Sequence, residues 1–206
     1  LVGGVATLTT STLPVGVRGV RAVYGGDANF NGSTSPTVNA TVTKASTSTV
    51  LTSAPDPSVF GQAKTLTATV SAVAPGGGTP AGTVSFFEGA TLLGTGTLSG
   101  GTATLTTSSL GVGTHPLTAV YQGNTSYLTS TSPVDSQTVT QAASATVLTS
   151  APDPSVFGQG KILTATVSAV APGAGTPTGT VSFFEGATLL GTGTLSGGTA
   201  TLTTSA

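Results

Sequence analysis

A near-identical internal repeat constrains this chain more than any other feature of its sequence. Residues 49–108 recur as residues 146–205, a shift of 97 residues. This period matches the roughly 100 residues of one β-sandwich domain and exceeds the 20–50 residues of solenoid units. We therefore expect each repeat to close its own core. The two copies differ at only four of the 60 positions, namely Ala63 against Gly160, Thr65 against Ile162, Gly77 against Ala174, and Ala81 against Thr178.

The repeat divides the 206 residues into three parts. Residues 1–45 correspond to the C-terminal part of one repeat, residues 46–142 to a complete repeat, and residues 143–206 to the N-terminal part of the next. A half sandwich would expose its inner face and strand edges to water. Either the chain is a window on a longer array, or the last part of one copy is completed by the first part of another, head to tail in a fibre. The second interpretation would supply the strand equivalent to residues 98–109 twice, which argues against it.

Alternation of aliphatic residues with Thr and Ser predicts the strands of the complete repeat. It is clearest in residues 63–73, where Leu66, Ala68, Val70 and Ala72 share one face. Leu117, Ala119 and Tyr121 form the same pattern in residues 116–121. The other expected strands are 82–89, 91–96, 102–106, 134–141, and a first edge strand, 50–53 and 58–60, that prolines interrupt. Turns separate these strands and helical periodicity is absent, which predicts an all-β sandwich of two sheets.

Charge is scarce in this sequence, and Thr is abundant. Charged residues make up 5% of the chain and the net charge is -1, whereas about 25% is usual for a soluble domain. Nucleic-acid binding therefore has no electrostatic basis, and no polybasic patch suits an anionic lipid surface. The absence of Cys excludes disulfides and Cys-based sites, and no apolar run approaches the roughly 18 residues that span a bilayer. The 44 Thr residues suit a pleated, hydrated surface.

No group of residues in the sequence predicts a catalytic, cofactor-binding or metal site. His115 is the only His, and Arg18 takes the equivalent place, so we expect a polar residue at a strand end. Calcium requires several oxygen ligands close together, whereas the carboxylates of this chain are dispersed. The six carboxylates are Asp27, Asp56, Glu88, Asp135, Asp153 and Glu185.

Five of the six carboxylates have a simpler expected role than ligand binding. Asp27 lies in a strand-end loop and could join a calcium site, but its equivalent is Asn124. Asp56 and its equivalent Asp153 lie between two prolines, where a local turn contact is expected. Glu88 and Glu185 share one position before a Gly, which fits a turn. Asn31, Asn39 and Asn124 begin glycosylation triplets that chance explains in so Thr- and Ser-rich a chain.

Residues 24–30 have the sequence YGGDANF, and residues 121–127 are a diverged copy of it. This segment is similar to the usual Y-x-G-D-x-N-F ending of the bacterial Ig-like repeats found in large surface and secreted proteins. The resemblance implies tandem immunoglobulin-like β-sandwiches of about seven strands per repeat, in an extracellular or cell-surface protein, and leaves the function open. The other segments that carry the resemblance are residues 53–62, 66–70, 82–86 and 110–121.

The repetition favours a structural function. A binding site needs one copy, whereas reach grows with copy number, so we expect a stalk, spacer or filament unit that works through length and mechanical continuity. Its partners would be neighbouring repeats and, in a fibre, other copies of the chain. The alternative is an adhesin-type module that recognises glycans or another surface through Thr-rich faces or Phe86 and Phe87. Phe86 should point inward, and Phe87 is either exposed or buried through a bulge. We expect no enzyme activity and no cofactor.

Overall fold

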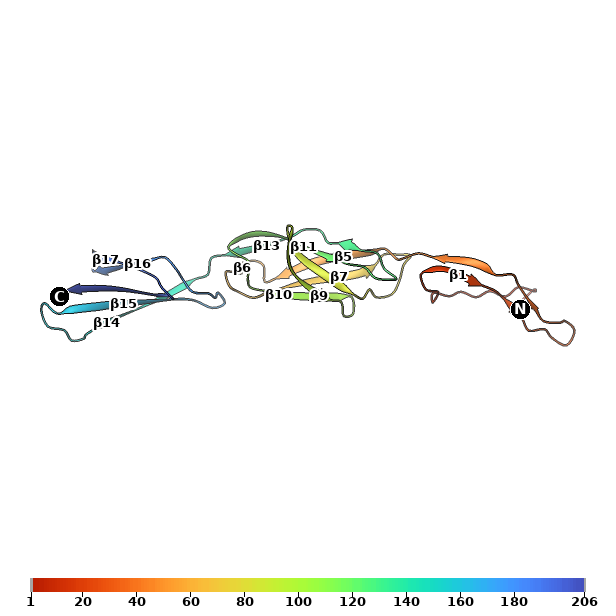
Figure 1. Ribbon diagram of the computed structural model, residues 1–206, viewed down its shortest axis with the longest axis horizontal. Coiled ribbons are helices and arrows are strands. Elements are labelled where there is room, and N and C mark those ends of the chain that lie inside the picture. The colour runs from red at the N-terminus through yellow and green to blue at the C-terminus, as the bar shows by residue number, and fades with distance from the viewer. Residues whose placement is uncertain (1, 206) are drawn as a thin grey trace. The chain divides into compact units, whose positions relative to one another are not determined.

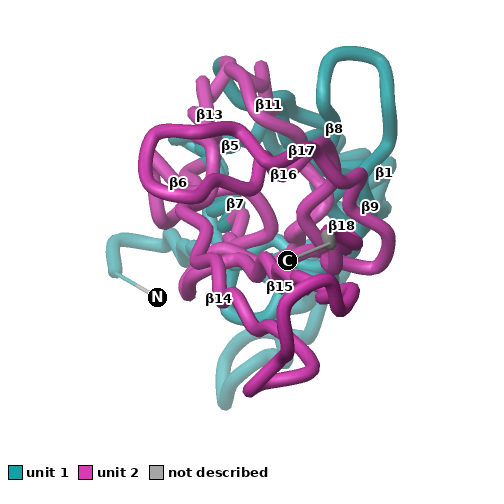
Figure 2. Tube along the Cα trace, turned by 90° about the vertical axis from the view of Figure 1, so that its left-hand side faces the viewer, with its two compact units in different colours: residues 1–51, 67–104, 118–133 teal, residues 52–66, 105–117, 134–206 magenta. Residues whose placement is uncertain are grey.

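The computed structural model describes residues 2–205, and these consist of β-strands and their connections. The all-β fold class predicted from the sequence is therefore confirmed. Within residues 2–205 no helix could cross a membrane. The chain forms two compact units, distinguished by colour in Figure 2. Unit 1 contains residues 1–51, 67–104 and 118–133, and unit 2 contains residues 52–66, 105–117 and 134–206.

Two sheets carry the strands of the middle repeat (Figure 1). The first has the order β10-β7-β5 and contains β5 (Thr47–Ala54), β7 (Lys64–Ala72) and β10 (Thr102–Thr107). The second has the order β6-β13-β11-β8-β9. It contains β6 (Ser58–Val59), β8 (Thr83–Glu88), β9 (Thr91–Thr97), β11 (Gly113–Tyr121) and β13 (Asp135–Thr140), and β12 (Ser130–Thr131) pairs with β11. The sequence predicted each of these strands except β12.

The core of unit 1 takes residues from both sheets. Ala68 and Val70 of β7 are 0% and 2% exposed, and Ala119 and Tyr121 of β11 are both 0% exposed. In unit 2, Leu66 of β7 and Leu117 of β11 are also 0% exposed. The inner faces predicted for β7 and β11 are confirmed. The other buried apolar residues of unit 1 are Leu51, Val84, Phe86, Leu98 and Ala103.

The first strand of the middle repeat is interrupted at Pro55 and Pro57, as predicted. Its two halves, β5 and β6, lie at the edges of different sheets. β6 pairs in parallel with β13, with Ser58 opposite Val139 and Val59 opposite Thr140. Proline has no N–H to donate to a ladder, so the two prolines end one pairing and allow the chain to begin another.

A bulge separates Phe86 from Phe87 in β8. The register against β9 shifts between them, so Phe86 lies opposite Gly94 and Phe87 opposite Leu92. Phe86 is 0% exposed and Phe87 is half-buried. The predicted bulge is present, but it buries only Phe86 fully, because Phe87 remains half-buried.

The first and last parts of the chain contain fewer strands. β1 (Gly16–Val20) pairs with β4 (Val38–Val42), and β2 (Val23–Tyr24) pairs with β3 (Ser33–Thr34). After the middle repeat, one sheet has the order β14-β15-β18 and another contains β16 and β17. Their bounds are β14 (Ser144–Ala151), β15 (Gly160–Ala169), β16 (Thr180–Glu185), β17 (Thr188–Thr194) and β18 (Thr199–Ser205).

Candidate functional site

The carboxylate of Asp27 is bound by its own loop. Its Oδ1 accepts hydrogen bonds from the N–H groups of Asn29 and Phe30 at 2.8 and 2.9 Å, and its Oδ2 accepts one from the Tyr24 hydroxyl at 2.8 Å. The bonds from Asn29 and Tyr24 hold the pKa of Asp27 below its ordinary value, and the bond to the carboxylate raises the pKa of Tyr24. Both oxygens of the acid therefore shape this turn.

Asn124 forms the same turn in the middle repeat without a charge. Its Oδ1 accepts bonds from the N–H groups of Ser126 and Tyr127 at 2.8 and 2.9 Å. Its Nδ2 donates to the carbonyl of Ala81 at 2.9 Å, and the Tyr121 hydroxyl donates to the same carbonyl at 2.8 Å. An amide can replace the acid because the turn needs an acceptor oxygen and not a charge. Across residues 2–205 no three His, Cys, Asp or Glu side chains gather as a metal site would require.

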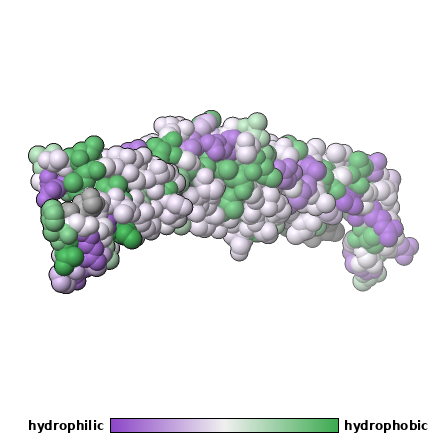
Figure 3. Space-filling view, turned by 60° about the vertical axis from the view of Figure 1, so that its left-hand side comes forward, coloured by the Kyte–Doolittle hydropathy of each residue, from purple (hydrophilic) through white to green (hydrophobic). Residues whose placement is uncertain are grey.

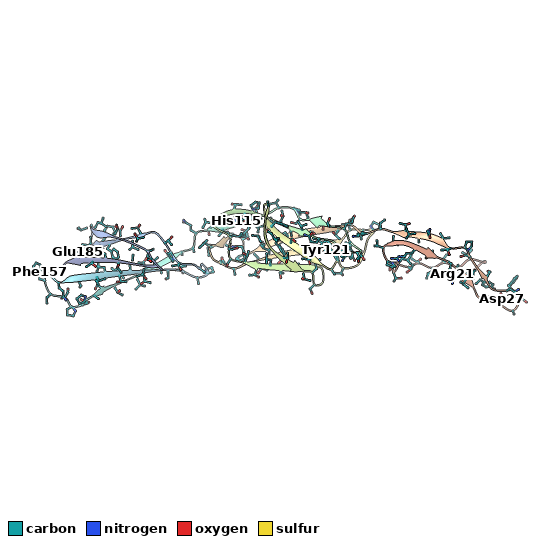
Figure 4. The ribbon with its side chains drawn as sticks, in the orientation of Figure 1. Arg21, Asp27, His115, Tyr121, Phe157 and Glu185 are labelled. Atoms are coloured by element: carbon teal, nitrogen blue, oxygen red, sulfur yellow. The ribbon has the colours of Figure 1, made fainter. Side chains whose placement is uncertain are left out.

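His115, Glu88 and Glu185 belong to three different strands, and Figure 4 labels His115 and Glu185. His115 lies near the start of β11, and its Nε2 is 2.9 Å from the carbonyl oxygen of Gly111. Glu88 ends β8 opposite Thr91, and Glu185 ends β16 in the same way. Each is a polar residue at or near the end of a strand.

Asp56 links the beginning of the middle repeat to its last strand. Its Oδ1 accepts a bond from the N–H of Thr138 at 2.9 Å and one from Nε2 of Gln137 at 3.1 Å. These partners are 82 and 81 residues away in the sequence. The sequence predicted a local turn contact for Asp56, whereas its bonds to Gln137 and Thr138 are long-range. We call the segment 55–60 and its partners on β13 the terminal clamp.

Gln137 is the buried centre of the terminal clamp. Its side chain is 0% exposed, and Nε2 also lies within hydrogen-bonding distance of the carbonyls of Pro55 and Thr138, at 3.1 and 3.0 Å, and of Ser58 Oγ at 3.4 Å. A buried amide without such partners would be destabilising by about 1–3 kcal/mol. The sequence analysis did not single out Gln137. Its position inside the predicted strand 134–141 could have indicated a polar side chain that needs hydrogen-bond partners.

Backbone pairing completes the terminal clamp. The N–H of Phe60 donates to the carbonyl of Thr140 at 2.8 Å, and the Thr140 hydroxyl donates to the carbonyl of Ser58 at 3.3 Å. Together with the parallel pairing of β6 and β13, these bonds join the two strands that begin and end the repeat. A pulling force applied to both ends of the repeat would act on the hydrogen bonds between β6 and β13 along the direction of these strands.

The last part of the chain shows the clamp residues without their partner strand. Asp153, the equivalent of Asp56, has a side chain that is 73% exposed, and its Oδ1 lies 3.6 Å from Nζ of Lys161. In the middle repeat the equivalent Lys64 is 1% exposed, and its Nζ has no hydrogen-bond partner among the described residues. Asp153 therefore pairs with Lys161, whereas the equivalent Asp56 pairs with β13, the last strand of the middle repeat.

The buried ammonium of Lys64 should destabilise the middle repeat at neutral pH. Burial lowers the pKa of Lys64 below its ordinary value of 10.5. Between this lowered pKa and 10.5 the unfolded chain holds a proton that the folded chain has lost, so the contribution of Lys64 to stability rises with pH. We expect Lys64→Met to stabilise the middle repeat by about 1–2 kcal/mol at pH 7, and this advantage should shrink as the pH approaches 10.5.

Pulse proteolysis in urea, read by mass spectrometry on peptides from β11, would measure the effect of Lys64→Met. Burial also raises the pKa of Tyr121. Because Tyr121 is present in the variant and in the unmodified chain, the difference in stability between these two proteins reports on Lys64 alone. Lys161→Met is the matched control, because Lys161 is 25% exposed and has an acidic neighbour. Equal stability of the Lys64→Met variant and the unmodified chain at every pH would contradict the prediction.

The fold and the clamp together define a class of protein. A sandwich of two antiparallel sheets, in which the first strand changes sheets and pairs in parallel with the last, is an immunoglobulin-like domain. The model of one family, described as "Bacterial Ig-like domain (group 3)", matches residues 1–43, 51–140 and 148–206. The chain belongs to this family, which confirms the resemblance seen in the sequence.

Two further comparisons add little to this assignment. A solved structure of fibronectin(III)-like modules of CbhA from Clostridium thermocellum is similar, at 22% identity and a TM-score of 0.34. The similarity covers 77% of this chain and 78% of the other. No curated protein matches the chain.

Proposed function

We propose that this chain is a structural repeat of an extracellular or cell-surface protein, where it serves as a stalk, spacer or filament unit without catalytic activity. The terminal clamp is the observation that carries the proposal. It joins β6 and the preceding segment around Asp56 to β13. These are the segments near the beginning and the end of the repeat, through which a neighbouring repeat would transmit force. When parallel strands are pulled in opposite directions along their axes, their hydrogen bonds share the load and break together.

The surface supports the same role. Most of the face in Figure 3 has the intermediate hydropathy typical of Thr, Ser and Gly, with apolar residues set among them. The 44 Thr residues give strands hydroxyl groups that water can solvate with little charge. Such a surface suits a module that is repeated for its length.

The adhesin alternative relied partly on the region of Phe86 and Phe87, where one of the two rings could have been exposed. Phe86 is 0% exposed and Phe87 is half-buried, so the two do not form an aromatic surface patch. Screening the chain against a glycan array would test this alternative directly. Specific binding of one glycan class would favour the adhesin function over the spacer function.

Pulling the chain from its two ends in an optical trap tests the spacer function. The middle repeat should unfold in one high-force step that releases roughly 97 residues, or about 350 Å of extended chain at about 3.6 Å per residue. The incomplete first and last parts should extend at lower force. Gradual lengthening without a distinct step would contradict a load-bearing repeat.

A further inference from the structure

The two linkers between repeats are bound in the same way to the repeat that follows each of them. The carbonyl of Ser46, just before β5, accepts a hydrogen bond from the N–H of Val73 at 2.9 Å. The carbonyl of Ala143, just before β14, accepts the equivalent bond from the N–H of Val170 at 2.8 Å. Each bond joins a linker to the loop that follows the long strand of the next repeat, β7 or β15.

We call residues 75–78, and the equivalent residues 172–175, the junction loops. Gly76 and its equivalent Gly173 lie so close to the linker that a Cβ added to them would be 2.7 and 2.5 Å from the Cβ of a linker alanine. The N–H of each glycine also donates to the carbonyl three residues before it, at 3.0 Å in both loops. The two junction loops therefore have the same local structure, and only glycine permits so close an approach.

The turn that follows β6 contacts the second junction loop. The N–H of Ala174 donates to the carbonyl of Phe60 at 3.2 Å. A Cβ on Gly175 would lie 3.2 Å from Cε1 of Phe60, so the aromatic ring lies against this glycine. Gly61 has a φ of +77°, and a Cβ added to it would overlap the carbonyl of Ala174. The turn thus meets the loop through both its backbone and its side chain.

The terminal clamp holds this turn beside the start of the linker. The N–H of Phe60 donates to the carbonyl of Thr140 at 2.8 Å, and Thr140 ends β13. Within the turn, the N–H of Gln62 donates to the carbonyl of Val59 at 3.0 Å. The side chain of Gln62 returns the contact, because its Oε1 accepts a bond from the N–H of Val59 at 3.0 Å. The turn is therefore an ordered surface and not a loose connection.

We propose that successive repeats of this chain dock on each other through a specific joint, in which the turn at Phe60 and Gly61 of one repeat binds the junction loop of the next. The complete middle repeat has both halves of the joint, the turn and the junction loop at residues 75–78. The partner is therefore another copy of the repeat, at the neighbouring position in the same chain. The joint would serve a spacer and an adhesin alike, so it does not rest on the proposed function.

Double electron–electron resonance between two spin labels tests the joint in the full chain. The chain has no Cys, so Thr95→Cys and Thr192→Cys place one label at the same exposed position in each of two successive repeats. The labelled chain should give one narrow distance distribution, whereas repeats joined only by a flexible linker would give a broad one. Gly61→Ala adds a Cβ where the junction loop lies, so it should broaden the distribution. A broad distribution in the labelled chain without this substitution would overturn the proposal.

Gly158→Ala is the matched control for the glycine variant. Gly158 is the equivalent of Gly61 and has a φ of +81°, and no described atom lies within 4 Å of the Cβ that alanine would add. Both substitutions therefore place alanine in the same unfavourable backbone conformation, but only the one at Gly61 reaches a junction loop. The distribution should remain narrow in the Gly158 variant. The proposal fails if the two variants behave alike.

Phe60→Ala tests the joint without strain in the turn. The Phe60 ring is 42% exposed, so the middle repeat should keep its fold, which hydrogen exchange in β7 would check. The distance distribution should broaden because the ring no longer packs on Gly175. Phe157→Ala, at the equivalent position, should leave the distribution unchanged. Equal distributions in these two variants would overturn the proposal, and this pair decides alone if Gly61→Ala loses the protection of β7.

Discussion

Replacement of Phe86 by Ala should lower the free energy of unfolding of the middle repeat by about 3–5 kcal/mol. The ring is 0% exposed, and a Cβ built on Gly96 of the neighbouring strand would lie only 3.3 Å from Phe86 Cε2. The ring is therefore packed against backbone that cannot readily collapse into a cavity. Hydrogen exchange of peptides from β11, measured in the full chain, would report the change.

Phe87→Ala is the control for the Phe86 variant. The two residues are adjacent in β8, but the bulge leaves Phe87 half-buried, and its loss should lower the free energy of unfolding by less than about 2 kcal/mol. If both variants lose equal stability, the assignment of Phe86 to the core would be wrong.

Asp56→Ala should weaken the middle repeat against both denaturant and force. The variant leaves the N–H of Thr138 without its acceptor and removes one acceptor from the buried Gln137. The expected loss of stability is about 1–3 kcal/mol, and the force of the unfolding step in the optical trap should fall. Asp56 ties the segment that precedes β6 to β13, so its removal should lower the unfolding force more than an equal loss of stability elsewhere in the core.

Asp153→Ala provides a control at the equivalent position in the same chain. Asp153 is 73% exposed on its side chain and its recorded partner is Lys161 at 3.6 Å, an exposed pair worth at most about 1 kcal/mol. This variant should leave the unfolding step of the middle repeat unchanged. An equal loss of force in both variants would show that Asp56 does not act through β13.

The sequence predicted the fold well because its signals are local. Alternation in residues 63–73 reports which side chains face the core, and the prolines around Asp56 mark the edge of a sheet. The bulge at Phe86 was also predictable, because two successive rings cannot both face inward in a regular strand. The short strand β12 has no such pattern, and its pairing with β11 depends on the path of the preceding loop.

The terminal clamp could not be derived from the sequence in the same way. Asp56 and Gln137 are 81 residues apart, and neither lies in a sequence motif that would predict a contact with the other. Their contact exists because β6 and β13 become neighbours, which is a property of sheet order and not of local pattern. The burial of Lys64 has the same origin, since the equivalent Lys161 remains partly exposed in the incomplete repeat.

The central claim is that about every 97 residues this chain closes a sandwich that is stable by itself. The most direct test is the folding of residues 46–142 as a separate protein. We expect a dispersed NMR spectrum, protected amides in β7 and β11, and a single cooperative unfolding transition. A spectrum typical of a disordered chain, or an unfolding curve without a cooperative transition, would contradict the claim.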